Sequence, residues 1–159
     1  KGLGAKNGVE FMYLSNRSTL STFSKDFINK VNDSRFSGYK WNNKALTVVA
    51  TLSSLIQEYG LPEFCKIDVE GYEFFVLEGL DKAIPCLSLE YNVPEFSDTL
   101  GKCLSKLDTL DKNYVFNYSV GESCLLALDV WLSYDEFTKL SETSSFVKTE
   151  FGDIYAKIN

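Results

Sequence analysis

The alternation of strand-like and helix-like segments is the feature that most constrains how this chain can fold. Strands are expected at residues 8–15, 45–50, 64–69, 86–91, 114–119, 124–132 and 154–158. Helices are expected at 52–59, 72–80, 98–110 and 133–142, the first capped by Thr51 and the last by Ser133. This order is typical of an open sheet that is parallel in its middle. It predicts a single domain with a three-layer α/β fold.

Residues 16–44 interrupt this order. They are rich in Ser, Asn, Lys and Gly, so we expect a long irregular segment, and such segments often carry function. Two interpretations of the aromatic residues Tyr39, Trp41 and Tyr118 stay open: they line a substrate pocket, or they pack in the core.

Composition excludes several kinds of site. The 159 residues include no histidine, which excludes Ser–His and Cys–His nucleophilic sites, histidine zinc sites and histidine general bases. The net charge of −6 argues against a broad phosphate-binding surface, so no nucleic-acid partner is expected. No apolar run reaches the roughly 20 residues that span a bilayer, so no membrane partner is expected either.

The four cysteines form no C-x-x-C pair. Three of them lie inside apolar runs. Free thiols packed as small apolar side chains in a reducing compartment are the simplest interpretation, and this predicts a cytoplasmic protein.

The most informative segment is 64–80, FCKIDVEGYEFFVLEGL. An apolar strand runs into Asp68 and Glu70, Gly71 allows a sharp turn, and a helix follows at once. In an open α/β sheet, ligands bind beyond the carboxyl ends of the strands, so both carboxylates are expected at that crevice.

Two further charges accompany this pair. Lys66 precedes Asp68 by two residues on the same strand face, and Glu73 falls in the first helical turn, where the helix dipole stabilises a carboxylate. One interpretation makes these residues an active site. In the other, Asp68 and Glu70 only cap the helix and Lys66 only neutralises Asp68. Spacing alone favours neither.

Residues 66–73 read KIDVEGYE and residues 76–80 read VLEGL. This run resembles the signature block of the FkbM family of S-adenosylmethionine-dependent methyltransferases, approximately K-I-D-V-E-G-x-E followed by v-L-x-G. Segments 3–11, 18–22, 47–55 and 87–90 are similar to further family segments in the same order. The resemblance therefore covers most of residues 3–91 and implies a Rossmann-like class I methyltransferase fold.

The chain departs from the family pattern in two places. Ser53 stands where the family has an aspartate, and the glycine-rich cofactor turn after the first strand is missing. The family order would place Lys1 after three strand–helix units, so we expect about 80–100 upstream residues at about 30 per unit. On this hypothesis the chain is the carboxyl-terminal part of a methyltransferase domain, as the absent initiator methionine also suggests.

The resemblance implies methyl transfer from S-adenosylmethionine to a hydroxyl of a small metabolite or sugar. Without histidine, a carboxylate is the expected base, and Asp68 is the first candidate for base or hydroxyl orienter. Glu70 and Glu73 would assist it or bind the substrate, and Lys66 would lower the pKa of Asp68. By family position, Leu3 and Gly4 are the expected cofactor contacts.

Two alternatives stay open. Asp68-Val69-Glu70 could be the D-x-E metal site of a glycan-processing transferase, although two carboxylates are too few ligands to assign a metal. The chain could instead be a non-catalytic binding or assembly module. A sheet without its first strands would expose an edge and an apolar face, so we expect a homodimer or an associated amino-terminal segment to cover it.

Overall fold

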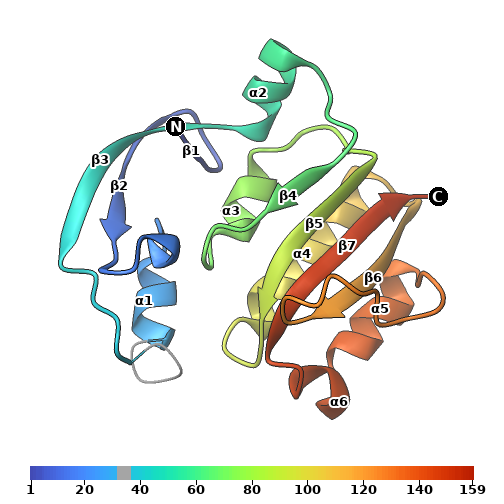
Figure 1. Ribbon diagram of the computed structural model, residues 1–159. Coiled ribbons are helices and arrows are strands. Elements are labelled where there is room, and N and C mark those ends of the chain that lie inside the picture. Colours follow the sequence, from blue (N-terminus) through green and yellow to red (C-terminus); the bar gives the residue numbers. More distant parts are fainter. Residues whose placement is uncertain (32–36) are drawn as a thin grey trace.

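The computed structural model describes residues 1–31 and 37–159 (Figure 1). Its larger sheet has four strands in the order β4 (Cys65–Ile67), β5 (Cys86–Asn92), β7 (Phe151–Ile158) and β6 (Tyr114–Val120). β4 and β5 are parallel, whereas β7 runs antiparallel to both of its neighbours. The predicted α/β class is confirmed, and the parallel pair places two strand ends at one edge of the sheet.

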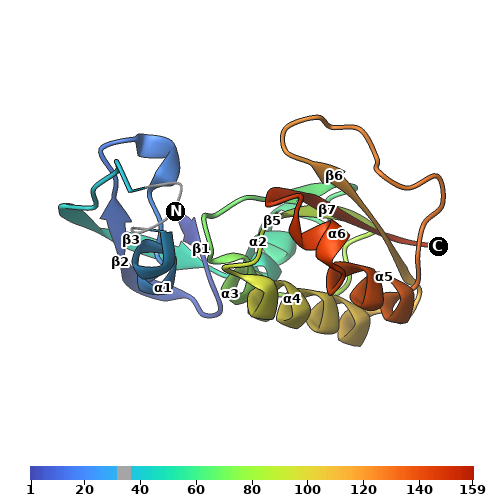
Figure 2. The same ribbon diagram turned by 90° about the horizontal axis from the view of Figure 1, so that it is seen from below.

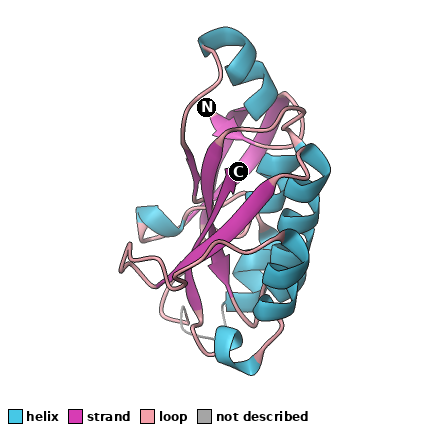
Figure 3. Ribbon diagram, turned by 90° about the vertical axis from the view of Figure 1, so that its right-hand side faces the viewer, coloured by secondary structure: helices cyan, strands magenta, loops and turns pink. Residues whose placement is uncertain are grey.

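Helices cover one face of this sheet (Figures 2 and 3). They are α3 (Glu73–Glu78), α4 (Ser97–Leu110), α5 (Tyr134–Ser141) and α6 (Ser144–Val147). The apolar residues of α4 recur at helical spacing, and Leu100, Cys103, Leu104 and Leu107 are all buried. They join Leu87 and other strand residues in the main core.

The smaller sheet has the order β1 (Gly2–Leu3), β3 (Asn43–Ala50) and β2 (Gly8–Leu14). The segment η1 (Ser18–Leu20) and helix α1 (Lys25–Val31) follow β2, and α2 (Leu52–Tyr59) follows β3. Val9 pairs with Val48 and Phe11 with Leu46, so these four side chains share a face, and all four are exposed. The expected second copy that would cover such a face stays a prediction.

A close backbone contact joins the smaller sheet to the end of α3. A Cβ atom on Gly79 would lie 2.3 Å from the carbonyl oxygen of Gly4, so only glycine fits at the end of α3. Nearby, the Tyr72 hydroxyl donates a hydrogen bond to the Glu10 carboxylate at 2.8 Å. The smaller sheet is therefore held against the helix that follows the D-V-E-G segment.

The structure corrects two predictions, one in the amino-terminal half of the chain and one in the carboxyl-terminal half. Residues 16–44 are not wholly irregular, because they contain η1, α1 and the start of β3; the Ser24 hydroxyl accepts the Phe27 N–H and caps α1. The strand predicted at 124–132 does not form. There, the Asn117 side chain binds the backbone of Leu128, and only an isolated bridge links Phe116 to Leu132.

The final strand is longer than predicted, because β7 begins at Phe151 and pairs along the whole of β5. No helix in the described ranges is long and apolar enough to cross a membrane.

Candidate functional site

The turn after β4 has an unusual backbone. Glu70 has φ 53° and Gly71 has φ 78°, both in the left-handed region. Glycine adopts this region readily, but for a glutamate it is uncommon and costs conformational energy. Such residues often mark functional sites, where the surrounding structure must hold them in place.

Glu73 braces this turn from the inside. Its buried carboxylate accepts the backbone N–H groups of Val69 and Gly71, each at 3.2 Å. Burial raises the pKa of Glu73 to about 7, although these hydrogen bonds favour the charged form; the charge of Asp68 adds to the rise. The structure therefore places Glu73 against the backbone of the turn, and its predicted catalytic role stays a prediction.

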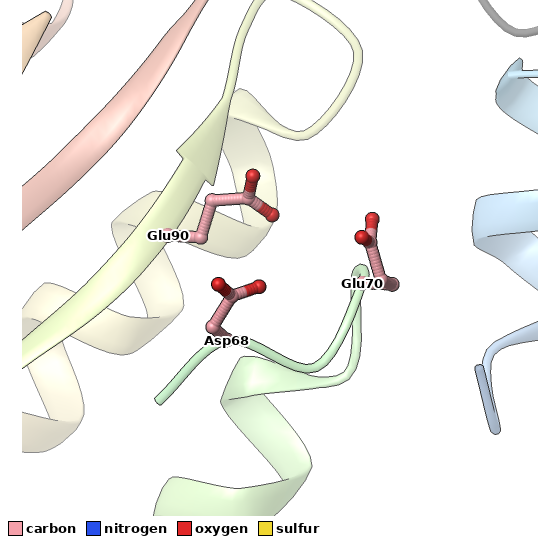
Figure 4. Close-up of side chains that lie close together, drawn as sticks. All are labelled: Asp68, Glu70 and Glu90. Atoms are coloured by element: carbon pink, nitrogen blue, oxygen red, sulfur yellow. The ribbon is translucent and has the colours of Figure 1, made fainter. Parts of the chain in front are cut away.

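A third carboxylate joins Asp68 and Glu70. Glu90, in β5, points toward them, and carboxylate oxygens of the three residues lie within 4.8 Å of one another (Figure 4). Burial and the neighbouring charges of Glu70, Asp68 and Glu73 raise the pKa of Glu90 to about 8, against a hydrogen bond from the Asn92 amide. Glu90 therefore keeps a proton at neutral pH and can exchange it near pH 8.

Lys66 lies on the same side of the sheet as Asp68, as the spacing predicts. Its Nζ is 3.5 Å from an Asp68 oxygen but only 2.7 Å from Asp153. Partial burial disfavours its charge, yet Asp153 and, less strongly, Asp68 raise the pKa of Lys66 overall. Asp153 lies in β7, opposite Glu90.

The carboxylates open onto a cleft of about 610 Å³. The amino-terminal region contributes Arg17, whose Nη1 donates a hydrogen bond to the Tyr39 hydroxyl at 3.1 Å. The carboxyl-terminal region contributes Glu122 and Phe151. The cleft is thus formed by residues far apart in the sequence, and acidic groups outnumber its one arginine.

Two of the three aromatic candidates do not line this cleft. The Trp41 indole donates a hydrogen bond to the Leu20 carbonyl at 2.7 Å and packs edge-on against Phe27. Tyr118 packs against Phe137 and other aromatic side chains of the core. Of the three, Tyr39 alone is a cleft residue.

The predicted cofactor contacts lie elsewhere. Gly4 is buried, and a Cβ atom there would lie 3.0 Å from Val49 and 3.4 Å from Tyr72. Leu3 packs against the main core. Neither residue lines the cleft, and their contact with a cofactor stays a prediction.

Comparison with known protein families decides the family. The model of the methyltransferase FkbM domain matches residues 2–118. The chain belongs to the FkbM methyltransferase family. Asp68, Glu70 and Glu90 all lie within the matched residues, and the fold is the Rossmann-like fold that the resemblance implied. No curated protein and no solved structure matches the chain.

Ser53, which replaces the aspartate of the family pattern, has a structural contact. Its hydroxyl donates a hydrogen bond to the Asp81 carboxylate at 2.7 Å and accepts the Asp81 N–H at 2.9 Å. Asp81 thus places a carboxylate beside the position at which the family sequence has one.

Sequence reasoning missed Glu90 as a site residue, although the signal was present. Glu90 lies near the end of a predicted strand that follows the segment with Asp68 and Glu70. Carboxyl ends of neighbouring parallel strands meet at one edge, so the same rule that selected Asp68 also points to Glu90. An acidic set of this kind also occurs on proteins without a metal, and we assign no metal site.

Proposed function

We propose that this FkbM-family protein transfers a methyl group from S-adenosylmethionine to a hydroxyl oxygen of a small metabolite or sugar. The observation that carries the proposal is the convergence of Asp68, Glu70 and Glu90 at the mouth of a cleft. Family membership supports methyl transfer, and the carboxylates support a reaction in which a proton must be removed.

The charge of the cleft suits a cationic methyl donor. Asp68, Glu70 and Glu122 contribute carboxylates to its lining. S-adenosylmethionine, when bound, supplies an electrophilic methyl group on a positively charged sulfur. Negative side chains near a sulfonium and an ammonium group favour binding by Coulomb attraction, and the effect is larger in a cleft than in open water.

The carboxylates would divide the handling of the acceptor between them. Asp68, next to Lys66, accepts a hydrogen bond from the acceptor hydroxyl and orients its oxygen toward the methyl group. Glu90, whose pKa is raised to about 8, would in its deprotonated form take the proton of the hydroxyl that accepts the methyl group. The products would be a methyl ether, the neutral thioether S-adenosylhomocysteine and a protonated Glu90, which returns its proton to solvent.

The test is methyl transfer from donor labelled in its methyl group, with a panel of sugars and hydroxylated metabolites as acceptors. We expect Glu90→Gln to lower kcat by about 10²–10⁴, the usual range for a lost general base. Asp68→Asn should lower kcat to a smaller extent, because it weakens the hydrogen bond that orients the acceptor hydroxyl. Asp98→Asn, a change at an exposed carboxylate on α4, is the matched control and should keep full activity. Full activity in both site variants would overturn the assignment of the site.

A further inference from the structure

The amino-terminal region reaches the strained turn through Thr22. This side chain is 1% exposed, and its hydroxyl donates a hydrogen bond to the carbonyl oxygen of Glu70 at 2.8 Å. The same hydroxyl oxygen accepts the N–H of Ser24 at 2.9 Å. Its backbone N–H and carbonyl are both paired with Tyr13, at 3.0 and 2.8 Å. Hydrogen bonds to Tyr13 and Ser24 therefore hold Thr22 in place within the amino-terminal region, independently of its contact with the turn.

A second contact from the same segment holds the next residue. Phe27, which is fully buried, packs so closely on Gly71 that an added Cβ atom would lie 2.8 Å from its ring. The two left-handed residues of the turn, Glu70 and Gly71, are thus both contacted by residues 22–27, while Glu73 holds the turn from α3. A left-handed glutamate persists only where its surroundings impose that conformation.

The conformation of this turn determines the direction of the Glu70 side chain. Because the left-handed backbone sets where the Glu70 side chain points, it brings the Glu70 carboxylate beside Asp68 and Glu90. A relaxed turn would let this carboxylate move away. We infer that Thr22 is a positioning residue for the active site, whose hydroxyl holds Glu70 in the conformation that completes the carboxylate cluster. The inference rests on the proposed function, because it assigns the amino-terminal segment a role in that same site.

The test compares Thr22→Val, which has the same shape without the hydroxyl, with Thr22→Ser, which keeps the donor. Side-chain carboxyl carbons are followed by ¹³C NMR during a pH titration, and Glu90→Gln identifies the Glu90 signal. The charges of Glu70, Asp68 and Glu73 and the Asn92 amide act on Glu90, and Asp153, paired with Lys66, lies opposite it in β7. We expect Glu90 to titrate near pH 8 in the wild type and in Thr22→Ser, and at clearly lower pH in Thr22→Val.

A purely structural threonine would not move this titration in a folded variant. An unchanged Glu90 signal in folded Thr22→Val would therefore overturn the inference. If Thr22→Val does not fold, Thr22→Ala replaces it. Failure of both to fold would make Thr22 a structural residue only, which also overturns the inference.

Methyl transfer, measured in parallel, separates this inference from the proposed function. Thr22→Val should move the rise of kcat with pH to lower pH, as it moves the Glu90 titration, and should raise the KM for the cationic donor, because the Glu70 charge no longer lies beside Asp68 and Glu90. A wild-type protein that titrates as expected but transfers no methyl group would contradict the proposed function alone. A Thr22→Val variant of an active enzyme with the wild-type pH profile of kcat and the wild-type donor KM would contradict the positioning role alone.

Discussion

The two sheets of the molecule differ in how they are buried and in what they contribute to the site. In the four-stranded sheet, Leu87, Phe116 and Ile154 are completely buried beneath the helices. In the three-stranded sheet, Val9, Phe11, Leu46 and Val48 are 49–68% exposed. The larger sheet therefore supplies most of the packing, while the smaller one reaches the site through a few specific contacts.

The two regions also differ in charge. Residues 1–50 hold half of the 16 basic residues but only three of the 22 acidic ones, so the rest of the chain is strongly acidic. Arg17 comes from the basic region, and the carboxylates of the cleft come from the acidic one. The comparison suggests that the larger sheet carries the chemistry and the smaller one holds its turn in place.

Core truncation tests the difference in packing most strongly. Phe116→Ala should lower the free energy of unfolding by about 3–5 kcal/mol, because it removes a fully buried ring from the main core. Leu46→Ala, at a side chain that is 68% exposed, should change it by no more than about 0.5 kcal/mol. Urea unfolding of both variants measures the contrast. Equal losses would show that both sheets depend on burial to the same degree.

The buried carboxyl groups predict how stability depends on pH. Folding raises the pKa of Glu73 to about 7 and that of Glu90 to about 8, so the folded state binds protons that the unfolded chain releases near pH 4.3. The stabilisation from these two protonated groups is complete below about pH 4.3. It is lost as the pH rises through their pKa values in the folded state. We expect the free energy of unfolding to fall between about pH 5 and 8, and to fall less in Glu90→Gln. Urea unfolding at several pH values checks this, and a flat or rising curve would contradict it.

The junction between the sheets is tested at Gly79. Gly79→Ala forces a Cβ atom against the Gly4 carbonyl and should cost about 1–3 kcal/mol, the usual price of overpacking. Gly101→Ala is the matched control, because that glycine lies in α4 with open space around it, and alanine should stabilise the helix by about 0.5–1 kcal/mol. Thermal unfolding compares them. If Gly79→Ala is as stable as the wild type, the close contact does not hold the sheets together.

The sequence predicted β2 and β3 of the smaller sheet as well as the strands of the larger one, but it missed the helix between them, for a physical reason. Most strands and helices after residue 51 show clear apolar periodicity, because one face of each is buried. The helix α1 has only Phe27 and Val31 buried, so its pattern was too weak to detect within residues 16–44. The error at 124–132 has the opposite cause, since Leu125 and Val130 look like strand residues but are exposed.

The candidate site was predicted in part. Asp68, Glu70 and Lys66 follow from the position of one strand end, and the structure brings them together. Contacts between residues far apart, such as Thr22 with Glu70 and Lys66 with Asp153, produce no periodic pattern in the sequence and could not be predicted from it. The raised pKa of Glu90 also depends on burial that only the folded chain creates.

The dependence of methyl transfer on pH tests the central claim most directly. With an acceptor from the panel, we expect kcat of the wild type to rise with an apparent pKa near 8, as Glu90 loses its proton. In Asp68→Asn the residual activity should rise at lower pH, because a neighbouring negative charge that raises the pKa of Glu90 is gone. A kcat that does not change with pH, or a midpoint that stays the same in Asp68→Asn, would contradict the account.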